Sequence, residues 1–139
     1  MDETGDNPVF SRRHALLGGL AATSVALTSV AVDAGWESMT PQCRLTSFAG
    51  LDKASARAIG RTYLEAHAHE AHADALVETV LARLELEATA AQSMRYAALK
   101  ERIDAAISQD FDAGDTVMLE GWVLSRTEVR LCALVAVTA

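Results

Sequence analysis

The chain has few of the residues that build redox and cofactor sites. Its 139 residues include two cysteines, Cys43 and Cys132, and aromatic side chains make up only 5% of them. One pair of cysteines cannot hold an iron–sulfur cluster, and the Cys-x-x-Cys-His motif for covalent haem is absent. The sequence therefore contains no evident cofactor site.

Motifs of common enzyme families are also missing. The chain has no Gly-x-Ser-x-Gly elbow and no local Cys/His signature. It has no phosphate loop and no dinucleotide fingerprint, and the pair Gly18-Gly19 belongs to the N-terminal segment described below. No catalytic residue is predicted, and a non-catalytic subunit is favoured over an enzyme.

Positive charge is scarce in the body of the chain. From Gly35 onward, ten Lys and Arg residues stand against fifteen Asp and Glu residues, a net charge of −5. An acidic surface repels phosphate backbones, and no basic stripe is evident in the sequence. Nucleic acid is therefore not expected as a partner.

An arginine pair and an uncharged segment occupy the N-terminus. Ser11-Arg12-Arg13-His14-Ala15-Leu16-Leu17 is followed by an uncharged run, residues 20–32, that is diluted by Thr and Ser. The segment resembles the twin-arginine consensus Ser/Thr-Arg-Arg-x-Phe-Leu-Lys at Ser11, Arg12, Arg13 and Leu16. The resemblance implies that residues 1–34 form a helical export signal. It also implies that the twin-arginine translocase, a transient partner, carries the folded chain to the periplasm.

Small residues offer two cleavage points, after Ala31 and after Ala34. We favour the second, because Gly35 then opens the mature chain. The alternative is an uncleaved signal: residues 14–32 are long enough to cross a bilayer and would anchor the protein in the inner membrane. The Gly, Ser and Thr content of the run favours removal, so only the signal segment is expected to contact the membrane.

Apolar periodicity predicts a mostly α domain of about four helices over residues 35–139. Residues 35–49 are expected to be irregular, and a first helix to begin at the N-cap residue Asp52. The second helix places apolar residues at helical spacing from Leu76 to Leu84, and the third runs from Ala90 to Ile107.

The C-terminal part carries clear turn and cap signals. Residues 110–115 read as a loop, and Glu120-Gly121 lies between two short apolar segments, which predicts a β-hairpin. Ser125 and Glu128 have the spacing of a capping box at the start of a last helix. That helix is nearly all apolar, so it is either a core helix or a docking surface.

Three histidines, His67, His69 and His72, lie within six residues. If this stretch is helical, Glu65, His69 and His72 share one face and could bind zinc, copper or nickel. The spacing is not the His-Glu-x-x-His of metalloproteases. The other interpretation is a solvated connection between helices. A stand-alone periplasmic metal-binding protein is therefore the alternative function.

Three aspartates, Asp110, Asp112 and Asp115, suggest a calcium loop. An EF-hand needs Gly at its sixth position and Glu at its twelfth, whereas Gly114 comes one position early and Gly121 occupies the twelfth. The other interpretation is a solvated turn whose Asp side chains support the backbone.

The two cysteines permit one disulfide outside the cytoplasm, which would join Cys43 to Cys132. Closure of so long a loop stabilises by about 4 kcal/mol in the chain-entropy model. Cys132 lies in an apolar segment, however, where a buried free thiol is common. Both interpretations remain open at this point.

The body resembles the small subunits of periplasmic flavin-dependent sugar and polyol dehydrogenases. The likeness covers the twin-arginine signal and residues 45–64, including Gly60-Arg61-Thr62-Tyr63-Leu64, with Trp122 as a counterpart of a downstream tryptophan segment. It implies an exported helical accessory subunit that escorts a larger protein subunit. Such subunits do not supply the flavin chemistry, so no catalytic residue is carried over.

Overall fold

The computed structural model describes residues 35–50 and 52–139. The predicted signal lies outside these residues. Its motif residues Ser11, Arg12, Arg13 and Leu16 and both cleavage points therefore remain predictions.

The described part of the chain is mostly helical, with one antiparallel hairpin before the last helix, as the sequence predicts. The predicted number of about four helices is too low. Residues 35–50 and 52–139 contain six α-helices and one short 3₁₀ helix. In chain order the elements are α3 (Pro41–Thr46), α4 (Lys53–Ala66), η1 (Ala68–Glu70), α5 (Ala73–Arg83), α6 (Ala88–Ser93), α7 (Tyr96–Ala113), β1 (Thr116–Leu119), β2 (Trp122–Ser125) and α8 (Arg126–Val137).

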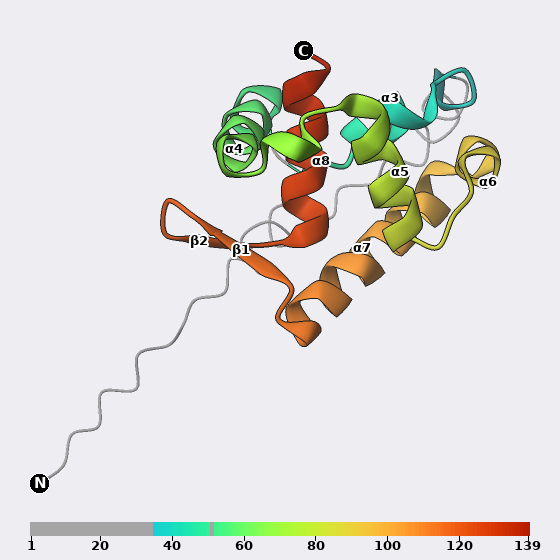
Figure 1. Ribbon diagram of the computed structural model, residues 1–139. Coiled ribbons are helices and arrows are strands. Elements are labelled where there is room, and N and C mark those ends of the chain that lie inside the picture. The colour runs from blue at the N-terminus through green and yellow to red at the C-terminus, as the bar shows by residue number, and fades with distance from the viewer. Residues whose placement is uncertain (1–34, 51) are drawn as a thin grey trace, which may run out of the picture.

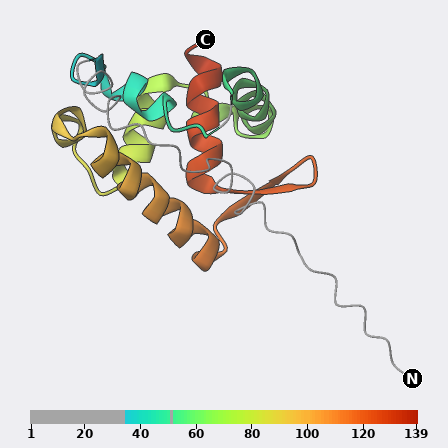
Figure 2. The same cartoon turned by 180° about the vertical axis from the view of Figure 1, so that it is seen from behind.

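Helix α8 is the central element of the fold. It packs against α3, α4, α5 and α7, and Figure 1 shows these helices arranged around it. Its residues are buried on nearly every side, because the segment is almost entirely apolar. Of the two interpretations of this helix, a core helix and a docking surface, the structure shows the core helix. The view from behind in Figure 2 shows the hairpin extending away from this helical body.

Local signals fix where two of the helices begin. The Asp52 carboxylate accepts hydrogen bonds from the main-chain N–H groups of Ala54 and Ser55, both at 3.0 Å, which confirms the predicted cap of α4. At α8, Ser125 Oγ accepts from Glu128 N at 3.0 Å, and Glu128 Oε2 accepts from Ser125 N at 2.8 Å. The predicted capping box is therefore present.

The expectation of an irregular segment over residues 35–49 is wrong for Pro41–Thr46, which form helix α3. Thr40 caps helix α3 by accepting a hydrogen bond from the N–H of Cys43, and Pro41 occupies the first helical turn. The sequence pattern does not predict this helix, because its six residues are too few to show apolar periodicity. Leu45 on α3 is fully buried in the core, so the segment is an integral part of the domain.

The single helix expected over residues 90–107 is two helices, α6 and α7. The chain is extended at Met94 and Arg95, with ψ values of 137° and 153°. The Arg44 guanidinium donates to the carbonyls of Ala91 and Met94 at 3.0 and 2.8 Å. Because a distant side chain satisfies these carbonyls, the helix can end there without leaving them unpaired.

Helix α7 also runs further than expected. The predicted loop over residues 110–115 is wrong for its first four residues, which form the last turn of the helix. Gly114 then ends the helix in the left-handed region, with φ of 71°. Asp110 and Asp112 are therefore helical residues.

The predicted hairpin is confirmed. Strands β1 and β2 pair antiparallel, with Met118 opposite Val123 and Leu119 opposite Trp122. Both turn residues have positive φ, 49° at Glu120 and 83° at Gly121. Two such residues define a type I′ turn, whose twist matches that of the paired strands.

Within the two described ranges, no helix combines the length and the apolar character needed to cross a membrane.

We expect Gly60→Ala to destabilise the fold, because a Cβ at this position would lie 2.2 Å from the carbonyl oxygen of Cys132. Overpacking of a backbone contact predicts a loss of about 3 kcal/mol in the free energy of unfolding, measured by urea titration. Gly35→Ala is the matched control, since a Cβ there meets nothing within 4 Å and should change stability by less than about 0.5 kcal/mol. Equal stability of the two variants would contradict the close approach of α4 to α8.

Candidate functional site

The hairpin carries most of the large apolar side chains that the described residues expose. Met118 is 72% exposed, Val123 50% and Trp122 37%. Met39, just before α3, is the fourth such residue. Three of the four therefore gather on eight strand residues at one end of the molecule (Figure 1).

The hairpin packs on the domain through one of its two faces. Val117, Leu119 and Leu124 are partly buried against the main core. At the base, Arg126 Nε donates to Asp115 Oδ1 at 3.1 Å, and the N–H of Arg126 donates to the Asp115 carbonyl, also at 3.1 Å. The face that carries Val117, Leu119 and Leu124 is thus fixed to the domain, whereas Met118 and Val123 lie on the other face. Trp122 lies opposite Leu119 next to the turn and is partly exposed there.

Asp110 joins three helices through a buried carboxylate. Its Oδ1 accepts from Arg83 Nε at 2.9 Å, and Arg83 Nη2 lies 2.8 Å from the same oxygen. Its Oδ2 accepts from the N–H of Thr127 in the first turn of α8, at 2.8 Å. The interpretation of this segment as a solvated turn is wrong for Asp110, which is 1% exposed.

The calcium-loop interpretation fails for the same reason. Asp110 and Asp112 lie on a helix, the Asp110 carboxylate is occupied by protein donors, and Asp115 pairs with Arg126. An EF-hand loop presents its carboxylates together from an irregular segment. The structure instead uses Asp110 to orient α8 and Asp115 to hold the hairpin base.

A second polar network joins η1 to α8. Arg130 donates to both carboxylate oxygens of Glu70 at 3.0 Å, and the Tyr63 hydroxyl donates to Glu70 Oε2 at 2.9 Å. The hydrogen bonds from Arg130 lower the pKa of Glu70 below its ordinary value of 4.5. Burial raises the pKa of Tyr63 above 10.0. No local sequence pattern predicts this network, because sixty positions separate Glu70 from Arg130.

The histidine segment is not a continuous helix. Helix α4 ends at Ala66, so Glu65, His69 and His72 lie in α4, in η1 and at the N-cap of α5 respectively. The shared helical face on which the metal site depended does not form. Among the described residues, no group of three or more His, Cys, Asp or Glu side chains is placed to hold a metal ion. Metal binding by these histidines stays a prediction.

Each histidine has different surroundings. The His67 ring stacks on Tyr63 with centroids 4.1 Å apart, and its Nδ1 lies 3.0 Å from the Tyr63 carbonyl oxygen. The His69 side chain is 76% exposed and its ring centroid is 6.2 Å from that of His67. His67 therefore belongs to the packing of the segment, whereas His69 faces solvent.

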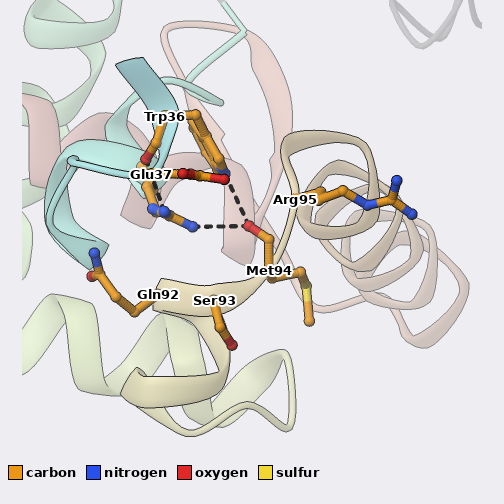
Figure 3. A pocket seen from close by; sticks show the side chains of 7 residues that line it. Trp36, Glu37, Gln92, Ser93, Met94 and Arg95 are labelled. Carbon is orange, nitrogen blue, oxygen red and sulfur yellow. Dashed lines mark hydrogen bonds between the residues drawn. The ribbon is translucent and has the colours of Figure 1, made fainter. Parts of the chain in front are cut away.

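Arg44 is a buried guanidinium that binds main-chain carbonyls. Besides Ala91 and Met94, it donates to the carbonyls of Met39 and Trp36, and its guanidinium carbon lies 4.7 Å from the centroid of the Trp36 ring. A hollow of about 360 Å³ lies beside it. Figure 3 shows the Trp36 ring pointing to the Met94 carbonyl, while Arg95 extends away from it. Arg44 donates to the same carbonyl. The hydrogen bonds of Arg44 thus account for the join between α3 and α6.

Both cysteines are free thiols in the structure. Cys43 is exposed on α3, whereas Cys132 is buried on α8. Burial raises the pKa of the Cys132 thiol to about 12, with a smaller contribution from the charge of Glu128. Of the two interpretations of this pair, the structure has the buried free thiol and no bridge.

Comparison with protein families, with curated proteins and with solved structures finds no match to this chain.

We expect the Glu70 network to make stability depend on pH in the acid range. Because the folded protein lowers the pKa of Glu70, this carboxylate stabilises the fold above pH 4.5 and loses its contribution as the pH falls through the lowered value. Glu70→Gln should cost about 2 kcal/mol at pH 7 and flatten this part of the profile. Glu101→Gln on the exposed face of α7 is the control. Parallel profiles for Glu70→Gln and the unmodified protein would remove Glu70 from the acid response.

Proposed function

We propose that the chain is a non-catalytic accessory subunit that is exported through the twin-arginine route and docks a larger protein through its hairpin. The arginine pair and the uncharged run that follows it support export. The resemblance to small subunits of periplasmic flavin-dependent sugar and polyol dehydrogenases supports an oxidoreductase as the larger partner.

The exposed hairpin is the observation that carries the docking part of the proposal. Folded domains seldom gather large apolar side chains on one protruding element unless another surface covers them. Met and Trp are also enriched at protein–protein interfaces. Met118, Val123 and Trp122 supply these residue types on the element that extends from the helical body.

The packing of the described domain is consistent with transport in a folded state. Its core is closed by the domain's own helices around α8, with Leu131, Ala133 and Leu134 fully buried. Of the four large apolar side chains that the described residues expose, the hairpin carries three. A chain of this kind folds first and then presents a preformed element to its partner.

The export step is tested by replacing both signal arginines with lysine, Arg12→Lys and Arg13→Lys, in the natural host. We expect the exported product to fall to near background and the full-length chain to accumulate inside the cell. N-terminal sequencing of the unmodified exported protein should begin at Gly35. Arg95→Lys, an exposed position in the body, is the control and should leave export unchanged. Undiminished export of the double variant would refute this part of the proposal.

The docking step is tested with Met118→Ser combined with Val123→Ser. Full-length protein carrying a C-terminal tag is purified from the exported fraction, and its stoichiometric partner is identified and then titrated against each variant. Loss of the apolar pair should weaken binding at least about tenfold, or about 1.4 kcal/mol, without lowering the melting temperature. Met39→Ser removes an exposed apolar side chain elsewhere and should bind as the unmodified protein does. Equal binding by all three proteins would exclude the hairpin as the docking element.

A further inference from the structure

The hairpin also indicates how a partner would bind. We infer that the hairpin accepts an extended apolar segment of the partner as an added β-strand, with a lysine or arginine of that segment placed against Glu120. This inference rests on the proposed function and specifies the kind of surface the accessory subunit recognises.

The register fixes which main-chain groups face outward. In a two-residue hairpin the residues that flank the turn, Leu119 and Trp122, form a hydrogen-bonded pair, and such pairs alternate along the ladder. The bond from the N–H of Arg126 to the Asp115 carbonyl continues this alternation at the base. Met118 and Val123 form the intervening pair, so their N–H and C=O groups point to the two outer edges.

These outer groups are available for pairing. Because Met118 and Val123 form a non-hydrogen-bonded pair in this register, their main-chain N–H and C=O groups do not pair across the hairpin. Such groups on an edge strand are a template for another strand, and natural proteins commonly protect them with a charged side chain, a proline or a covering element. Here the side chains at the edge are Met118 and Val123, which are apolar. At Met118 on β1 and at Val123 on β2, the outer edge is thus open to addition of a strand.

The side chains define what the added strand would present. Met118 and Val123 are directly opposite each other and lie on the same face of the hairpin. An added strand would place every second side chain beside them on this face. Apolar residues at these alternate positions would pack beside Met118 and Val123 and cover part of their exposed surface.

The turn supplies charge complementarity. Glu120 has φ of 49°, a left-handed conformation that favours Gly, Asn or Asp over Glu. Its side chain takes part in none of the ion pairs between described residues. Glu120 is therefore unfavourable for the stability of the turn, but it places a carboxylate at the tip. This combination indicates a functional role for the carboxylate. A cation near one end of the partner segment would complement it.

A second copy of this chain fits the hairpin less well than a different partner does. A stable symmetric interface uses about 20–30 residues from each side, whereas the hairpin exposes three large apolar side chains. Residues 35–139 of each copy also carry a net charge of −5, which opposes self-association. A larger protein that adds a strand, and so contributes main-chain hydrogen bonds, compensates for the small apolar area.

Proline substitutions separate strand addition from simple apolar contact. Met118→Pro and Val123→Pro each remove one outward N–H while the inward hydrogen bonds of the hairpin stay in place. The partner identified with the unmodified full-length protein is titrated against both variants. At least one should bind about fivefold or more weakly, with circular dichroism and melting temperature near those of the unmodified protein. Val117→Pro removes an inward N–H and serves as the control for loss of the hairpin itself.

Glu120→Asn provides an independent test in the opposite direction. Asn suits the left-handed position better, so this variant should be as stable as the unmodified protein or more stable. It nevertheless removes the carboxylate, and we expect the partner to bind it about threefold more weakly at low ionic strength. Retained affinity would refute the cation contact.

The remaining outcomes distinguish failure of strand addition from failure of the proposed accessory role. If both proline variants keep the hairpin and bind normally while Met118→Ser with Val123→Ser binds weakly, strand addition is wrong and the accessory role stands. If the unmodified protein has no stoichiometric partner, the accessory role itself fails. If light scattering shows a dimer that the proline variants convert to monomer, the edge pairs with a second copy and the inference is overturned.

Discussion

Close contact between α4 and α8 is the constraint on which the rest of the fold depends. Gly60 lies against the main chain of α8 at Cys132, where a side chain of any size would collide. This approach buries Ala56, Cys132 and Val135 between the two helices. Once α4 covers one side of α8, α3, α5 and α7 cover the others, and a twelve-residue apolar helix becomes the centre of a small domain.

Three charged groups, of which Arg44 and Asp110 are buried and Glu70 is partly buried, then position the helices around that centre. Arg44 binds the end of α6, the Glu70 network ties η1 to α8, and Asp110 links α5 and α7 to the start of α8. Each group makes several hydrogen bonds to its neighbours, which offset the cost of removing it from water. In a chain of short helices, these contacts fix geometry that apolar packing alone would leave variable.

Local patterns in the sequence predicted the elements whose signals lie close together in the chain. The cap at Asp52, the capping box from Ser125 to Glu128 and the hairpin turn each depend on residues a few positions apart. The break at Met94 could not be predicted in this way, because Arg44, some fifty positions earlier, stabilises it. The role of Asp110 likewise depends on Arg83 and Thr127. The exposure of Met118 and Val123 could not be predicted either, because both strands are apolar and only their packing on the domain distinguishes the two faces.

Because Cys132 is buried between α4 and α8, the rate at which its thiol is alkylated reports how often these helices separate. A thiol with a pKa of about 12, buried with Ala56 where α4 meets α8, presents almost no thiolate to an alkylating reagent at neutral pH. Cys43 on the surface would be modified at once, whereas Cys132 would react only in molecules where α4 has lifted away. The interval between the first and second additions of mass would therefore time the separation of the two central helices.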